Sequence, residues 1–191
     1  SIDLKILDKF LDNNIFKIEK QIGKFVKNIY LVIDDNRIFH LNIGIRKKNY
    51  KKKINKNFLE NTLTELKDLF KENYQHYKIM HLVVKNYIIN GNYYSSFIDN
   101  LSSENLCLEV QFISIPDSLS DEIDKVLEKY QIKIIRYLNK TYILGCDPEK
   151  KFDLIILFNK IINGFNDNEI LIIPKNPKKA GFFEKFFQLF S

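Results

Sequence analysis

The chain has 191 residues, of which 45% are hydrophobic, and a formal net charge of +6. This length and composition exclude a disordered chain and suit one folded domain with its own core. Three arginines among 30 cationic residues argue against base-specific reading of DNA, because such reading favours bidentate arginine contacts.

The first half of the chain predicts two helices and two strands. Apolar residues at positions 4, 7, 11, 15, 18 and 22 have the spacing of an amphipathic helix. Two β-rich runs, 29–33 and 39–45, flank Asp34-Asp35-Asn36, which predicts a hairpin with an Asx-type turn. The cationic run 46–53 is predicted to be a loop, and the apolar stripe that follows it predicts a helix at 56–73.

The second half predicts three strands and one helix. The run 78–89 predicts a strand closed by an Asn90-Gly91 turn, and the alternation in 105–116 predicts another. A helix follows, with Asp117 or Ser118 as its N-cap, and a strand at 131–138 comes after it. This order predicts an α+β domain, with helices on one face of a mostly antiparallel sheet.

Beyond residue 144 the pattern is looser. Residues 145–174 are interpreted as an apolar extension packed on the domain, with a helix or strand at 151–163 and a short strand at 169–174. The run 152–162 is too short to span a bilayer, which needs about 20 residues. Cys107 and Cys146 stand in apolar surroundings and are expected to be free, buried thiols in a reducing compartment.

The sequence does not contain a recognisable motif of catalytic residues. The histidines (His40, His76 and His81) lack metal-ligand spacing, and the two in predicted strands, His40 and His81, are interpreted as structural. The six glycines are isolated, whereas phosphate loops need them clustered. We therefore expect a non-enzymatic protein without catalytic residues, metal ligands, cofactors or a small-molecule substrate.

The cationic run is the feature that best suits a polyanion. Its candidate residues are Arg46, Lys47, Lys48, Lys51, Lys52 and Lys53. One tyrosine, Tyr50, is available for stacking, which is a weak match to a single-strand binding surface. A solvated loop is the preferred interpretation, and a basic nucleic-acid-binding protein remains an alternative function.

The end of the chain predicts a membrane-binding helix. In "FFEKFFQLF" every apolar residue falls on one side of a helical wheel, behind a basic linker that contains proline and glycine. Aromatic residues beside lysines are typical of a helix that lies in the interface of an anionic membrane. The opposing interpretation is that this helix packs on its own domain. The candidate membrane-binding residues are Phe182, Phe183, Phe186, Phe187, Leu189, Phe190, Lys178, Lys179 and Lys185.

Residues 25–142 resemble the SHS2 subdomain (1C) of the bacterial cell-division protein FtsA. The resemblance lies in "VKNIYLVIDDNRIFHLNI", "INKNFLENTLTEL", "KIMHLVVKNYIINGN" and "LCLEVQFISIPDSLSDEIDKVLEKYQIKI". The family's Tyr-x-x-Asp-Gly turn corresponds to Tyr87, Asn90 and Gly91, with Asn90 in place of the aspartate, and its Leu-Glu strand corresponds to Leu108 and Glu109. The Pro/Gly-Met segment between the family's two strands is missing here.

The actin-like ATPase lobes of that family have no counterpart in this chain, so ATP and FtsZ binding are not carried over. The resemblance implies an SHS2-like interaction domain at 1–144 and a basic linker with an amphipathic helix at 175–191. It implies a membrane-tethered adaptor of bacterial cell division, a reduced FtsA-like protein on the cytoplasmic face of the membrane. Its expected partners are other division proteins or copies of itself, and an anionic membrane surface. A PilM-like pilus-assembly adaptor is a further alternative.

Overall fold

The computed structural model describes residues 2–50 and 53–170. The predicted basic linker and terminal helix at 175–191 lie outside the described residues, as do Lys51 and Lys52 and most of the short strand expected at 169–174. The described part of the chain combines α-helices with a mostly antiparallel sheet, which confirms the predicted mixture of elements.

The described helices and strands follow the predicted order, with additions. The helices are α1 (Leu4–Ile22), α2 (Lys56–Asn73), α3 (Asp117–Glu128), α4 (Lys140–Gly145) and α5 (Leu154–Ile162). The longer strands are β1 (Asn28–Ile33), β2 (Phe39–Lys48), β4 (Tyr77–Ile89), β7 (Asn105–Pro116) and β8 (Lys133–Asn139). The short strands are β3 (Lys53–Ile54), β5 (Asn92–Tyr94) and β6 (Leu101–Ser102). Helix α4 was not predicted.

The strands form one antiparallel sheet and two smaller pairs. The sheet has the order β2-β7-β4-β5, and β4 turns into β5 at Asn90-Gly91, as predicted. Strands β1 and β8 form a parallel pair, and β3 pairs with β6. The predicted hairpin between 29–33 and 39–45 is wrong. Its turn does form, since Asp35 accepts a hydrogen bond from the backbone N–H of Arg37, but β1 pairs with β8 and β2 pairs with β7.

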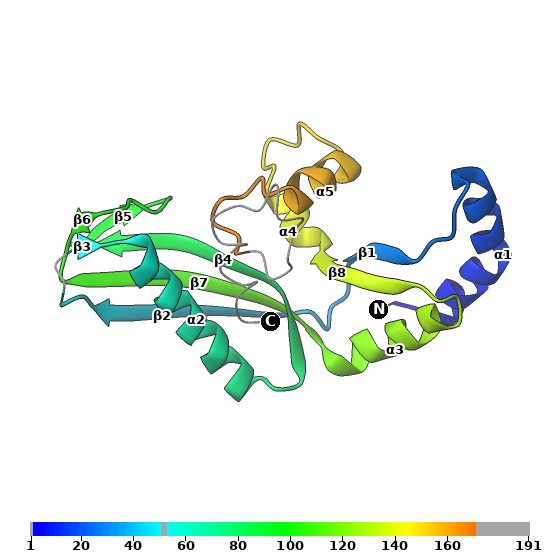
Figure 1. Ribbon diagram of the computed structural model, residues 1–191, viewed down its shortest axis with the longest axis horizontal. Coiled ribbons are helices and arrows are strands. Elements are labelled where there is room, and N and C mark those ends of the chain that lie inside the picture. Colours follow the sequence, from blue (N-terminus) through cyan, green and yellow to red (C-terminus); the bar gives the residue numbers. More distant parts are fainter. Residues whose placement is uncertain (1, 51–52, 171–191) are drawn as a thin grey trace.

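Two hydrophobic cores are joined by the long strands β4 and β7. Side chains of a strand alternate between its two faces, so Leu82 and Phe112 enter a core under α2, whereas Val83 and Ile113 enter the other core. That second core includes residues of α1, α3, α4 and α5 and of the β1–β8 pair. Figure 1 shows the resulting elongated molecule, with α2 beside the sheet and α1 at the opposite end.

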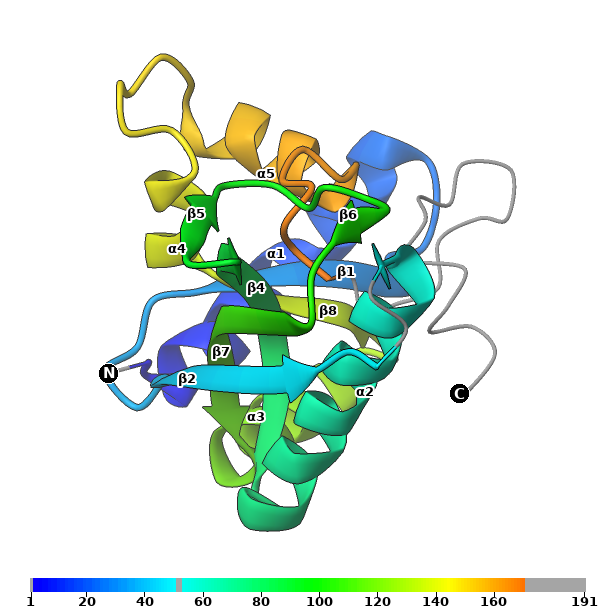
Figure 2. The same cartoon turned by 90° about the vertical axis from the view of Figure 1, so that its left-hand side faces the viewer.

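The prediction that all helices share one face of the sheet is wrong. Helix α2 packs on one face through Leu63, Leu66 and Phe70, whose side chains are buried. Tyr142 of α4 approaches the other face, where its ring centre lies 4.1 Å from that of His81 on β4. Figure 2 shows α2 on one side of the sheet and α4 with α5 on the other.

Two local predictions need correction. Helix α3 begins after Pro116, and neither Asp117 nor Ser118 caps it with a side-chain hydrogen bond. The cationic run is not a single loop, because Arg46 to Lys48 continue β2, and Lys53 begins β3. Cys107 and Cys146 are free, as expected, but they are half-buried rather than buried.

Candidate functional site

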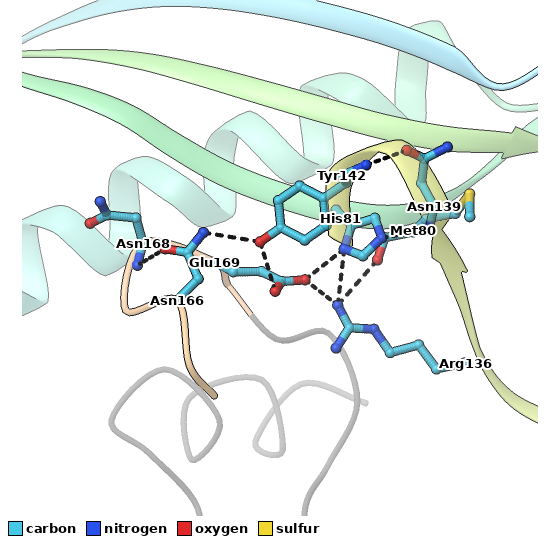
Figure 3. A network of polar contacts seen from close by, with 8 residues as sticks. All are labelled: Met80, His81, Arg136, Asn139, Tyr142, Asn166, Asn168 and Glu169. Atoms are coloured by element: carbon cyan, nitrogen blue, oxygen red, sulfur yellow. Dashed lines mark hydrogen bonds and ion pairs between the residues drawn. The ribbon is translucent and has the colours of Figure 1, made fainter. Parts of the chain in front are cut away.

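A buried polar network lies where the end of the described chain meets the sheet (Figure 3). His81 of β4, Arg136 of β8 and Tyr142 of α4 converge there on Glu169, whose side chain is 2% exposed. The Tyr142 hydroxyl donates to Glu169 Oε2 over 2.9 Å, and Arg136 Nη2 donates to Oε1. Buried charges persist when they are paired and hydrogen-bonded, as this carboxylate is.

The hydrogen bonds of His81 determine its protonation. The backbone N–H of Asn139 donates to His81 Nε2 over 2.9 Å, so this nitrogen carries no proton. The proton therefore sits on Nδ1, which lies 2.7 Å from Glu169 Oε1 and donates to it. Burial lowers the pKa of His81 by disfavouring the imidazolium. His81 is accordingly neutral and structural, as predicted, whereas His40 is exposed on β2.

Glu169 is the charged member that the others stabilise. Burial by itself raises the pKa of this carboxyl, but the hydrogen bond from His81 and the charge of Arg136 outweigh it, so the pKa lies below its ordinary value. Together with Asn166 and Asn168, which bond to Tyr142 and to the backbone of Ser95, the carboxylate fixes residues 166–170 to the body. The network therefore acts as an anchor for residues 166–170.

A cavity of about 330 Å³ lies beside this anchor, between the sheet and α4. Among its lining residues are His40, Lys85 and Cys146. Burial raises the pKa of the Cys146 thiol, which keeps it protonated and poorly nucleophilic at neutral pH. In residues 2–50 and 53–170, histidine, cysteine and carboxylate side chains do not gather in groups of three or more that could hold a metal ion.

The structure separates the residues of the predicted polyanion site. Arg46 and Lys48 are exposed on the face of β2 away from α2, whereas Lys47 turns toward α2 and pairs with Glu65. Arg46 and Lys48 line a cavity of about 330 Å³ with Tyr50, whose side chain is 90% exposed. Arg46, Lys48 and Tyr50 therefore lie together as a candidate polyanion surface, and the exposed Lys53 lies on another strand, β3, opposite Ser102 of β6.

A second exposed surface was not predicted and lies where α1 turns toward β1. Phe16 is 74% exposed and Phe25 is 75% exposed, and both line a cavity of about 770 Å³. Lys20, Lys24 and Lys27 also line it. The sequence pattern could have indicated this exposure, because neither phenylalanine belongs to the stripe of apolar residues that packs α1 on the body.

No model of a known protein family matches the chain, and no curated protein matches it. Within the part of the chain that the structure describes, no helix has both the length and the apolar character needed to cross a membrane.

Proposed function

We propose that the protein is a non-enzymatic, membrane-tethered interaction adaptor of bacterial cell division, a reduced FtsA-like protein with an SHS2-like domain. One observation carries the adaptor part: the large apolar side chains of Phe16 and Phe25 are exposed together and line one cavity where α1 turns toward β1. Exposed apolar clusters mark surfaces that bind a protein or a membrane. The proposed partners are other division proteins or further copies of the chain.

The resemblance to FtsA supports the division part of the proposal. The segments that carry it include strands β2, β4 and β7 and helix α2, which pack around one of the two cores. Tyr87 is buried in that core, and Asn90-Gly91 form the turn at the tip of β4. These residues therefore contribute to one packed unit that can present a surface to partners.

The proposed membrane tether is the terminal helix, and it can be tested with liposomes. Wild-type protein is expected to pellet with anionic vesicles and to remain in solution with neutral ones. The Phe183→Asp, Phe187→Asp double variant is expected to lose pelleting, because charge on the apolar face opposes insertion. A Gln188→Asp, Ser191→Asp double variant places the same two charges outside the apolar face and is the matched control. Equal pelleting of the double variant and the wild type would contradict the tether.

The division part is tested in cells. A fluorescent fusion is expected to gather at the division site on the cytoplasmic face of the membrane, and the tail variant is expected to leave it. A diffuse signal of the wild-type fusion in dividing cells would count against the proposal. Recruitment to a pilus-assembly site instead would favour the PilM-like alternative.

Nucleic-acid binding is the second candidate function, and one observation favours it. Arg46 and Lys48 point away from α2 on the same face of β2, next to the exposed ring of Tyr50. Cations beside an aromatic ring suit a single strand. This function predicts salt-dependent binding of an oligonucleotide that is lost in Arg46→Ala, Lys48→Ala and kept in Lys47→Ala. Unchanged binding in the double variant would exclude this surface.

A further inference from the structure

The turn between α1 and β1 carries an exposed aromatic and basic surface, which we call the α1 corner. It consists of Phe16, Phe25 and the exposed part of Ile22, with Lys17, Lys20, Lys24 and Lys27 around them. Phe16 and Phe25 are about three-quarters exposed, at 74% and 75%, and Ile22 is 48% exposed. The α1 corner lies at the end of the molecule remote from β5 and β6 (Figure 1).

The backbone holds the α1 corner in a defined shape. Gly23 ends α1 in the left-handed conformation, with φ of 72°, which favours glycine. Three residues later, the backbone N–H of Val26 donates to Glu19 Oε1 over 2.9 Å, so the turn is tied back to the helix. Val26 packs against the core, whereas Phe25 points outward. The exposure of Phe25 is therefore built into the turn.

The charge of the α1 corner favours one kind of partner. Residues 16–27 contain four lysines, all exposed or half-exposed, and one carboxylate, Glu19, which already accepts the bond from Val26. Cations around exposed aromatic rings complement an anionic lipid surface, where the rings enter the apolar layer and the lysines meet the headgroups.

We propose that the α1 corner inserts into an anionic membrane surface. The inference rests on the proposed function and deepens it, because it gives the tethered protein a second membrane contact on the folded body. Two weak contacts on one chain bind together more tightly than either alone. They also orient the body, since a single attachment point limits the distance of the body from the membrane but leaves its orientation free.

Single-tryptophan reporters test the proposal, because the chain contains no tryptophan. Phe25→Trp reports on the α1 corner, Phe187→Trp on the tail, and Ile155→Trp on α5, where the native side chain is 72% exposed. With vesicles containing phosphatidylglycerol, the fluorescence of the Phe25→Trp variant is expected to shift to the blue and to be quenched by brominated acyl chains. The fluorescence of the Ile155→Trp variant is expected to do neither.

Two results of this experiment would overturn the proposal. The first is an indole that stays water-exposed when the Phe25→Trp variant is bound to the anionic vesicles. The second is an equal blue shift of that variant on neutral phosphatidylcholine, because the lysines of the α1 corner would then contribute nothing to its binding.

Affinity measurements on the full chain give the second readout. The Phe16→Asp, Phe25→Asp double variant is expected to bind anionic vesicles at least about tenfold more weakly, since two aromatic anchors are lost. Ile6→Asp, at another exposed position on the same helix, is expected to change binding by less than about twofold. Wild-type affinity in the double variant overturns the proposal.

The two membrane contacts can fail independently. If the corner variant loses affinity while the Phe183→Asp, Phe187→Asp tail variant binds like the wild type, the α1 corner stands and the proposed tail tether fails. If the tail variant loses affinity and the corner variant does not, the tether stands and the α1 corner is excluded. Loss in both variants supports both contacts.

Discussion

The backbone N–H of Asn139 donates to His81 Nε2 across 2.9 Å, and this bond decides the charge of the buried network. Because Nε2 accepts this bond, the ring proton lies on Nδ1, which donates a hydrogen bond to Glu169 Oε1. Arg136 Nη2 is 3.3 Å from the same Nδ1, and both atoms carry protons, so a positive charge on the ring would face a cation directly. The fold therefore requires His81 to be neutral.

This requirement predicts that stability falls in mild acid. Burial lowers the pKa of folded His81 below the ordinary 6.5 that it has when unfolded, so the unfolded chain takes up a proton first. The free energy of unfolding should then fall as the pH drops below about 6.5, by up to about 1.4 kcal/mol per pH unit. Urea titrations on either side of that pH measure the slope.

Two variants control for this origin of the pH dependence. His81→Gln should be less stable but should lose the slope just below pH 6.5, whereas His76→Gln, at an exposed position, should keep it. Glu169 has a lowered pKa, so its contribution is present above its ordinary 4.5 and disappears only at more acidic pH. An undiminished slope in His81→Gln would refute the assignment.

Replacing one partner of the ion pair between Arg136 and Glu169 should lower the free energy of unfolding more than the loss of the ion pair alone would. Glu169→Leu leaves the buried Arg136 without its carboxylate, for which about 3–5 kcal/mol is the usual loss of stability. The Arg136→Leu, Glu169→Leu double variant removes both charges and should lose less than the two single variants summed. Chemical denaturation of all four proteins gives this cycle, and strict additivity would show that the pair is not coupled.

The core under α2 should depend strongly on Phe70. Its ring is 1% exposed and stacks on Phe112, with ring centres 4.6 Å apart. Phe70→Ala should lower the free energy of unfolding by about 3–5 kcal/mol, because a cavity remains. The neighbouring Leu69 is 48% exposed, and Leu69→Ala should cost no more than about 0.5 kcal/mol. Similar losses in both variants would mean that α2 is not packed as described.

Helix α1 should depend on Tyr130 for its position. Leu11 is the one buried residue of α1, while the Tyr130 hydroxyl reaches Asp12 over 2.6 Å and Asp8 over 3.1 Å. Tyr130→Phe should speed amide hydrogen exchange in α1 several-fold and leave β4 and β7 unchanged. The exposed Tyr93→Phe is the matched control. Unchanged exchange in α1 would show that the Tyr130 hydroxyl is not needed, and that apolar contacts and the ion pair between Lys129 and Asp8 suffice to hold the helix.

Local patterns in the sequence predict the elements well but not their partners. Helices α1 and α2 and strands β4 and β7 are long and periodic, so their positions are confirmed by the structure. The Asx turn at Asp35 was also predicted, yet β1 pairs with β8, joining Asn28 to Lys133. Pairing at that separation depends on packing of the whole domain, which a local alternation does not encode.

The candidate sites were less accessible to prediction for similar reasons. The buried network draws His81, Arg136, Tyr142 and Glu169 from four separate segments, and their spacing in the sequence is irregular. Helix α4, which supplies Tyr142, has six residues and is too short to show a helical period. The cationic run was visible, but only the strand geometry shows that Lys47 faces α2.

The long strands β4 and β7 hold the two cores together, although their pairing shifts register after Ile79 and after Val84 of β4. At about 3.3 Å per residue, the 13 residues of β4 extend for about 40 Å. Neither core can slide against the other without breaking the ladder of hydrogen bonds that the two strands share. A partner bound beside one core is therefore connected, through the same two strands, to a partner bound beside the other core.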